Sequence, residues 1–157
     1  MKNANIFWIV LSLLILGGVA GMVFRNDSPA LSSGEGVEVV VYRDASCGCC
    51  KVYADYLERL GFLVRQEIEP NMGAVKQEYG IPNELASCHT TIIGDYVVEG
   101  HIPVQAIEKL LAEKPDIKGI AMPGMPQGSP GMPGAKIGVW KIHTLERDGS
   151  SNVFLEL

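Results

Sequence analysis

The chain has 157 residues, a formal net charge of −5 and 47% hydrophobic residues. A chain of this length usually folds as one domain. The acidic balance, without a stripe of basic residues, argues against nucleic acid as a partner, and the sequence holds no glycine-rich loop of the phosphate-binding type.

The first element along the chain is an uncharged apolar stretch from Ile6 to Phe24. Its length just suffices to cross a bilayer as a helix. We expect residues 1–25 to be an uncleaved inner-membrane anchor, although a cleaved signal peptide with Lys2 in its n-region fits the same pattern. Either interpretation places the rest of the chain in the periplasm or another extracytoplasmic compartment. A buried helix is less favoured, because a domain this small can hardly cover such a run.

Residues 26–36 are polar and rich in serine and glycine, which indicates a flexible linker. Residues 37–42 are mostly β-branched and predict a strand covered on both faces. Apolar residues recur with a 3.6-residue period over 49–60 and predict a helix that Gly61 ends. The alternating segment 62–68 predicts a second strand, and a strand–helix–strand unit makes the two strands parallel.

Residues 71–79 predict a short helix that is capped by its first residue. Residues 91–93 and 96–99 predict two antiparallel strands, because Gly94-Asp95 between them is a hairpin signal. An amphipathic helix follows, with Pro103 as its first residue. This order, βαβ, a short helix and then ββα, is that of a thioredoxin-like fold.

The composition changes at Gly119. The segment 122–134 is rich in methionine, proline and glycine and predicts a loop. Residues 137–143 and 153–157 predict two short strands. Together these patterns predict an α/β, thioredoxin-like domain over residues 37–157 that ends in a Met/Pro/Gly loop plus two short strands.

The strongest functional signal is the distribution of the four cysteines. Cys47, Cys49 and Cys50 lie within four residues, and Cys88 is followed at once by His89. Cys47 and Cys50 have the C-x-x-C spacing of a redox dithiol, which makes both candidate catalytic residues. Cys49 is superfluous in an ordinary oxidoreductase, whereas a multi-thiolate metal site has a use for it. The spacing leaves three disulfide pairings open, and a plain disulfide staple explains the triplet poorly.

Several motifs occur in a characteristic order along the chain. They are Cys47-Gly48-Cys49-Cys50, Ser87-Cys88-His89-Thr90, Glu99-Gly100-His101-Ile102-Pro103, Met122-Pro123-Gly124-Met125-Pro126 and Gly128-Ser129-Pro130-Gly131-Met132. In this respect the chain resembles the CopG-like family of bacterial extracytoplasmic copper-associated proteins, formerly a domain of unknown function. The resemblance covers residues 37–134. It implies a thioredoxin-like fold and a copper-handling or copper-redox role.

The cysteines predict a site for Cu(I), which prefers soft sulfur ligands. We expect Cys47, Cys49 and Cys50 to lie at a helix N-terminus, where free amides and the helix dipole favour thiolate. In thioredoxin-like folds the loop before the third strand faces this turn and carries a cis-proline. Cys88 takes about that place here, and His89 beside it offers an imidazole ligand or a proton acceptor.

Met125 and Met132 are predicted as auxiliary metal ligands, because thioethers bind Cu(I) without ionising. The alternative for each is packing on the core, and the same choice applies to Met122. His101 fits a turn residue hydrogen-bonded to the backbone better than a ligand. We expect His143, in a late strand, to be structural.

The combined prediction is an extracytoplasmic copper-binding protein that is redox-active and acts in copper resistance. Its partners would be copper ions, as Cu(I) or Cu(II), and the membrane through residues 6–24. The alternative from another class is a thiol–disulfide oxidoreductase acting on protein disulfides. A third reading is a copper-transfer partner of an efflux pump or chaperone, without redox turnover.

Overall fold

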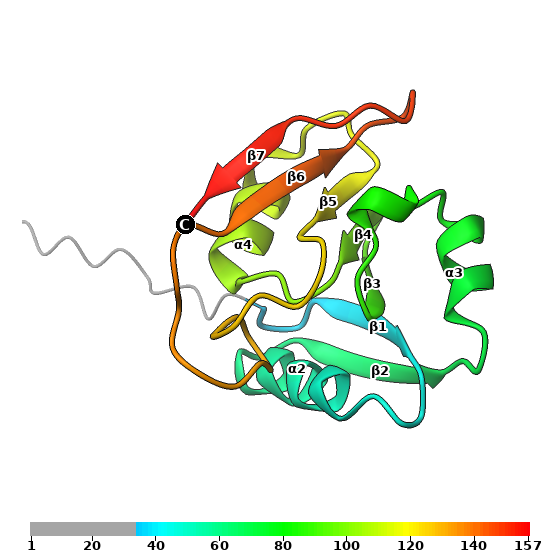
Figure 1. Ribbon diagram of the computed structural model, residues 1–157, viewed down its shortest axis with the longest axis vertical. Helices are drawn as coiled ribbons and strands as arrows, with labels where there is room; N and C mark the ends of the chain where they lie inside the picture. The colour runs from blue at the N-terminus through cyan, green and yellow to red at the C-terminus, as the bar shows by residue number, and fades with distance from the viewer. Residues whose placement is uncertain (1–33) are drawn as a thin grey trace, which may run out of the picture. The chain divides into compact units, whose positions relative to one another are not determined.

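The computed structural model describes residues 34–157, so the predicted anchor or signal peptide lies outside the described residues. A seven-stranded mixed sheet runs through the domain in the order β2-β1-β3-β4-β5-β6-β7 (Figure 1). None of the helices in this part of the chain is long and apolar enough to cross a membrane. In chain order the elements are β1 (Glu38–Arg43), α2 (Gly48–Arg59), β2 (Leu63–Ile68), α3 (Met72–Glu78), the 3₁₀ helix η1 (Asn83–Leu85), β3 (His89–Ile93), β4 (Tyr96–Glu99), α4 (Val104–Glu113), β5 (Gly119–Ala121), β6 (Lys141–Leu145) and β7 (Val153–Glu156).

The first half of the domain follows the order that the sequence predicts. β1 and β2 are parallel and joined by α2, and β1 also pairs antiparallel with β3. Gly61 follows the end of α2 with a φ of +89°, the left-handed conformation that glycine adopts most easily. The side chain of Asn71 accepts a hydrogen bond from Ala74 N at 3.1 Å and caps α3 as expected. The hairpin between β3 and β4 turns at Gly94.

Helices lie on both faces of the sheet. Side chains along a strand alternate between the two faces, so the strands contribute to a core on each face. Val39 and Val41 of β1 and Ile93 of β3 are buried in the main core, which also contains side chains of α2 and α4. A smaller cluster on the other face includes Val97 of β4 and Leu85 of η1. On that face the rings of Tyr42 in β1 and Tyr79, after α3, lie 5.7 Å apart. The main core comprises Val39, Val41, Tyr53, Ala54, Leu57, Phe62, Ile93, Val98, Ile102, Ala106, Ile107, Leu110, Ile117, Ile120, Met122 and Ile142.

The C-terminal part departs from the sequence prediction in two places. β5 was not predicted, because three buried residues are too few to show a period, and it pairs parallel with β4. Gly119 passes so close to the carbonyl of Val97 that no side chain would fit. The strand predicted at 137–143 instead runs over 141–145, because Ile137 and Val139 are exposed by 72% and 60%.

Candidate metal and redox site

Residues 47–50 form the cysteine turn, which joins the end of β1 to α2. Cys47 is the N-cap of the helix, and its amide donates to the carbonyl of Asp44 at 3.1 Å. Cys47 and Cys50 form a disulfide while Cys49 and Cys88 stay free, so the four cysteines adopt none of the three complete pairings that the sequence left open. Cys47 is partly exposed, whereas Cys50 is fully buried. Cys49 keeps a free thiol, with its sulfur 3.6 Å from that of Cys47.

Cys88, His89 and His101 form a second group, called here the histidine wall. Cys88 ends the loop before β3, His89 is the first residue of β3, and His101 follows β4. The Cys88 sulfur lies 3.3 Å from His89 Nδ1 and 3.1 Å from His101 Nε2. Both imidazoles are fully buried, and the free thiol of Cys88 is partly buried.

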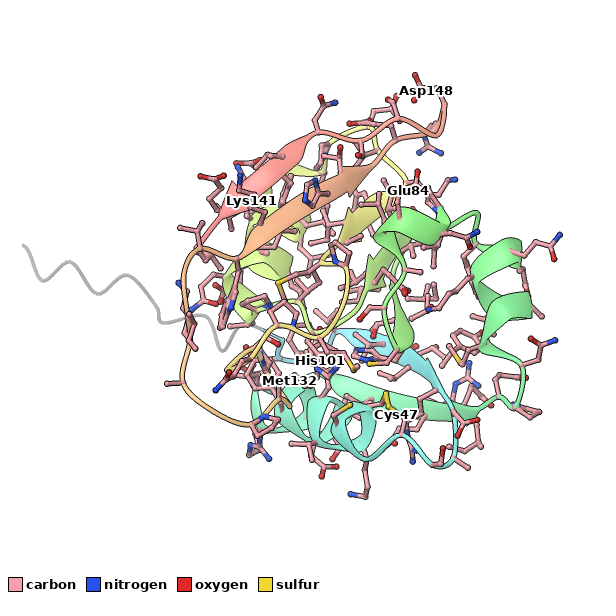
Figure 2. All side chains as sticks on the ribbon, viewed as in Figure 1. Cys47, Glu84, His101, Met132, Lys141 and Asp148 are labelled. Atoms are coloured by element: carbon pink, nitrogen blue, oxygen red, sulfur yellow. A yellow bond between two sulfur atoms is a disulfide. The ribbon has the colours of Figure 1, made fainter. Side chains whose placement is uncertain are left out.

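The cysteine turn and the histidine wall lie side by side, in the region where Figure 2 labels Cys47 and His101. The four cysteine sulfurs all lie within 4.8 Å of one another. The ligand atoms of Cys88, His89 and His101 form a second group within the same limit. Cys88 therefore belongs to both groups. The expectation that it faces the cysteine triplet is confirmed, although no peptide bond in the described chain is cis.

Burial sets the charge state of the histidine wall. It raises the pKa of the Cys88 thiol to about 12, and the neighbouring Cys49 adds to the effect. Burial, followed by His101 and the Lys76 ammonium, holds the pKa of His89 well below its ordinary value. Burial also lowers the pKa of His101, against the opposing effect of its hydrogen bond to Pro130. At neutral pH the wall thus consists of one thiol and two neutral imidazoles.

The hydrogen bonds of the two histidines leave ring nitrogens available to a ligand. His101 Nδ1 donates to the carbonyl of Pro130 at 2.7 Å, so Nε2 carries the lone pair that faces Cys88. His89 Nε2 is buried and has no hydrogen-bond partner within residues 34–157. The Tyr53 ring lies against His89, with ring centroids 4.5 Å apart, and fixes its orientation. The hydrogen bond from His101 to Pro130 is typical of a metal-binding histidine, which commonly donates its other N–H to a carbonyl.

The structure adds to the sequence prediction for His101 a contact with the Cys88 sulfur. His101 also makes the backbone hydrogen bond that its turn position favours. Gly100 before it has a φ of +83° and packs so closely on Ser87 that no side chain would fit. The sequence signal that could have indicated a role for His101 in the site is the glycine directly before it, at the end of a buried strand.

The methionine loop, residues 122–134, lies against the cysteine turn. A Cβ atom on Gly131 would stand 2.8 Å from the carbonyl oxygen of Cys49, so the loop approaches the start of α2 closely. Met132 is next in the chain and partly buried, whereas Met125 is 52% exposed. Met122 packs in the main core.

Similarity to known proteins assigns the chain to a family. Two solved structures of the copper resistance protein CopG, called form 2 and form 1, share 44% and 43% sequence identity with it. They cover 78% of this chain and 99% and 98% of their own chains, with TM-scores of 0.73 and 0.72. The chain belongs to the CopG family. Residues 85–132 also match a family described as "Protein of unknown function, DUF411", and no curated protein matches. The resemblance drawn from the CopG-like motifs is confirmed.

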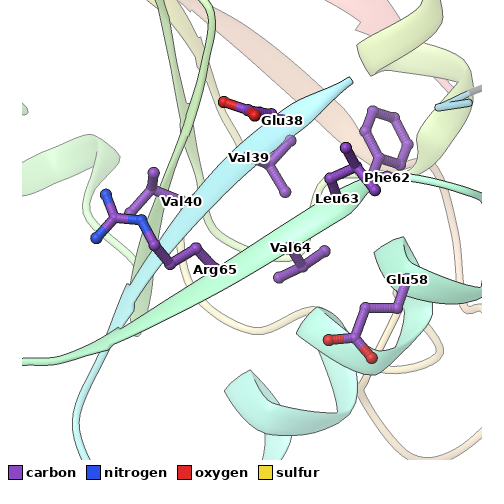
Figure 3. Close-up of a pocket in the computed structure, with 8 residues that line it drawn as sticks. All are labelled: Glu38, Val39, Val40, Glu58, Phe62, Leu63, Val64 and Arg65. Atoms are coloured by element: carbon purple, nitrogen blue, oxygen red, sulfur yellow. The ribbon is translucent and has the colours of Figure 1, made fainter. Parts of the chain in front are cut away.

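A pocket of about 580 Å³ lies at the other end of β1 and β2 (Figure 3). It opens where β1 begins, whereas the cysteine turn follows the end of that strand. Its lining contains neither sulfur nor imidazole, so a soft metal ion is expected to bind at the cysteine turn and the histidine wall and not in this pocket. The lining residues are Glu38, Val39, Val40, Glu58, Phe62, Leu63, Val64 and Arg65.

Proposed function

We propose that the protein is a copper-binding protein of copper resistance that works outside the cytoplasm and couples copper binding to thiol redox chemistry. The observation that carries this function is the position of Cys88, whose sulfur belongs both to the four-cysteine group and to the Cys–His–His group. Soft sulfur together with neutral imidazole is a donor set that suits copper. The relatives are named for copper resistance, which points in the same direction.

Cys49 and Cys88 would be the sulfur ligands while the disulfide is closed, and His101 and His89 the nitrogen ligands. His101 fits best, because its Nε2 lone pair faces the Cys88 sulfur while its Nδ1 donates to Pro130. Opening the disulfide would add the sulfurs of Cys47 and Cys50. Met132 remains an auxiliary ligand of this proposal, and Met125 a more exposed one.

The redox step would use the Cys47–Cys50 pair. Each thiol gives up one proton and one electron, the sulfur–sulfur bond forms, and two Cu(II) ions become two Cu(I) ions. A dithiol reductant would then restore the two thiols by disulfide exchange. Cys47 is the accessible sulfur of the pair and therefore the one that such a reductant attacks.

The finer description of the fold and the location belongs to the same proposal. A thioredoxin-like arrangement is supported by the parallel β1–α2–β2 unit and by the β3–β4 hairpin followed by α4. Residues 6–24 would anchor the protein to the inner membrane and hold the domain in the periplasm. Fractionation of cells that express the full chain tests this location, and recovery in the cytosol would contradict it.

Copper retention tests the proposed function directly. The anaerobic, reduced protein is loaded with Cu(I), desalted and assayed for metal. Wild type should retain copper, and Cys88→Ser should lose nearly all of it, because both ligand groups contain this sulfur. His143→Ala is the matched control, since His143 lies in β6. Equal retention by wild type and Cys88→Ser would refute the proposal.

A second function, thiol–disulfide exchange with proteins, is favoured by the C-x-x-C disulfide at the start of α2. The accessible Cys47 would be the nucleophile and the buried Cys50 the resolving thiol. Cys50→Ser should then trap a mixed disulfide on Cys47, and metal-free protein should reduce insulin. If both assays fail in a protein that retains copper, the thiol–disulfide function is excluded and only the copper function remains.

A further inference from the structure

Glu99 is a buried carboxylate that the proposed copper chemistry does not use. It is the last residue of β4 and is fully buried. Side chains alternate along a strand, so Glu99 lies on the same face of the sheet as Val97. Val97 belongs to the smaller hydrophobic cluster, which also includes Leu85 of η1. The adjacent Val98 instead belongs to the main core. Glu99 therefore lies on the face of the sheet opposite that core.

Three donors hold this carboxylate. Oε1 accepts from the backbone N–H of Ser87 at 2.6 Å and from Lys76 Nζ at 2.5 Å. Oε2 accepts from Thr90 Oγ1 at 2.7 Å. Lys76 comes from α3, and its side chain is only 16% exposed, so the ion pair is largely shielded from water. A buried ion pair is weak evidence for stability, because apolar residues of the same volume often serve as well.

Two of the three donors to Glu99 are direct sequence neighbours of the proposed metal ligands. Ser87 immediately precedes Cys88, and Thr90 immediately follows His89. Glu99 itself lies two residues before His101. One carboxylate thus joins the two short segments that carry the histidine wall, residues 87–90 and 99–101, and ties both to Lys76 of α3.

The backbone around Glu99 strengthens the same connection. Its carbonyl accepts from the amide of Met122 at 3.0 Å, which fixes the start of the methionine loop. The next residue, Gly100, donates to the carbonyl of His89 at 3.1 Å. A Cβ atom on Gly100 would lie 2.7 Å from the side chain of Ser87, so these two segments are in close contact.

We propose that Glu99 is a positioning residue that sets the Cys88 sulfur against the two imidazoles and thereby determines how tightly, and through which atoms, the site binds copper. This inference rests on the proposed copper function. Within residues 34–157 Glu99 makes no hydrogen bond to a proposed metal-ligand atom, so it would act through Ser87 and Thr90. Residues that orient metal ligands in this way typically change metal affinity by about 10- to 100-fold when removed.

The test compares three substitutions in the full chain by competition for Cu(I) with a chromophoric chelator. Glu99→Ala should weaken Cu(I) binding by at least about tenfold. Glu99→Gln should stay within about threefold of wild type, because its amide oxygen can still accept from the Ser87 amide. Thr90→Val keeps the shape of the strand residue and releases one carboxylate oxygen, so an intermediate loss of about threefold is expected.

Ile142→Ala is the matched control for a general loss of stability. Ile142 is fully buried in β6, in a C-terminal strand that carries none of the proposed ligands. It should lower the thermal midpoint without changing Cu(I) affinity. X-ray absorption at the copper edge supplies a second readout: Glu99→Ala should lose nitrogen relative to sulfur, while Ile142→Ala keeps the wild-type ratio.

The outcomes separate the inference from the function on which it rests. Wild type that binds no Cu(I) sinks the copper function itself. Wild type that binds Cu(I), with Glu99→Ala equal to it in affinity and absorption spectrum, overturns the role of Glu99 alone. If Glu99→Ala does not fold, Thr90→Val decides: unchanged affinity overturns the proposal, and weaker binding beyond that of Ile142→Ala supports it.

Discussion

The cysteine turn and the histidine wall face each other but differ in burial and in chemical state. The turn lies at the start of a helix, is partly exposed, and holds a closed disulfide beside one free thiol. The wall lies at the ends of two central strands, with two buried neutral imidazoles around a protonated thiol. Under the proposed function this contrast would divide the work, with the accessible turn exchanging electrons and the buried wall retaining the metal ion.

The largest effect should come from the residue that both regions share. Cys88→Ser removes the sulfur common to the two ligand groups, so Cu(I) affinity should fall by about 100-fold or more. Competition with a Cu(I) chelator measures this loss. The paired variant Cys49→Ser removes a sulfur from the turn alone and should lose less. A larger loss in Cys49→Ser than in Cys88→Ser would reverse the division of work.

The turn can be tested by removing its redox pair without touching the wall. The double variant Cys47→Ser with Cys50→Ser should lose stoichiometric reduction of Cu(II), because no disulfide can form between serines. Its Cu(I) affinity should remain within about tenfold of wild type, since the ligands of the wall are intact. Absorbance of a Cu(I)-specific chelator after addition of Cu(II) follows the reduction. Full reduction by the double variant would show that the electrons come from elsewhere.

The raised pKa of Cys88 predicts a pH dependence. In Cys49→Ser with the disulfide closed, Cys88 is the one free thiol of the chain. Burial is the largest cause of the raised pKa of Cys88 and remains when Cys49 is replaced, so alkylation should still accelerate about tenfold per pH unit from pH 7 to beyond pH 9. A small thiol of ordinary pKa levels off near pH 9 and serves as the reference. The same plateau in the protein would contradict the buried state of the wall.

The shift also sets the sign of the stability change. The folded pKa of Cys88 lies above its unfolded value of about 9, so the unfolded chain releases its proton first. This contribution to the free energy of unfolding is therefore full below pH 9 and is lost as the pH rises toward 12. Denaturant unfolding of the metal-free Cys49→Ser variant at pH 8 and pH 10 measures it, with a smaller change expected in Cys88→Ser.

The contact between the methionine loop and the turn should have a smaller effect. Gly131→Ala places a methyl group against the Cys49 carbonyl and should cost about 1–3 kcal/mol of stability, with several-fold weaker Cu(I) binding. Gly124→Ala is the matched control, because Gly124 has a similar positive φ but open space around it. It should share the backbone strain without the loss of affinity. Equal affinities in the two variants would separate the loop from the site.

The smallest expected difference concerns the two methionines proposed as auxiliary ligands. Met132→Leu should weaken Cu(I) binding by about threefold, because Met132 follows the glycine that touches the turn. Met125→Leu should have no measurable effect, since Met125 is more than half exposed. Chelator competition distinguishes them. A stronger effect of Met125→Leu would mean that the loop closes differently around copper.

The sequence was most informative where chemistry and local pattern coincide. The segments β1, α2 and β2 were predictable within one residue, because α2 buries one helical face and the two strands are a β-branched run and an alternating run. β5 was not predictable, since its three residues are all buried and show no alternation. The meeting of Cys88 with the cysteine turn was expected from the thioredoxin-like order that the sequence predicts.

Interactions between distant residues escaped sequence reasoning. Glu99 is held by Lys76, 23 residues away, and by Ser87, 12 residues away, and neither spacing carries a local signal. The bond from His101 to Pro130 spans 29 residues and depends on how the methionine loop returns to α2. Both depend on the tertiary structure, which brings together segments that are distant in the sequence.

X-ray absorption at the copper edge of the anaerobic, Cu(I)-loaded wild-type protein, beside Cys88→Ser, tests the shared site most directly. The account predicts copper surrounded mainly by sulfur at the short distance of thiolate ligands, with an added imidazole contribution, and little bound copper in the variant. Copper coordinated by oxygen and nitrogen alone, or an unchanged spectrum in Cys88→Ser, would contradict it.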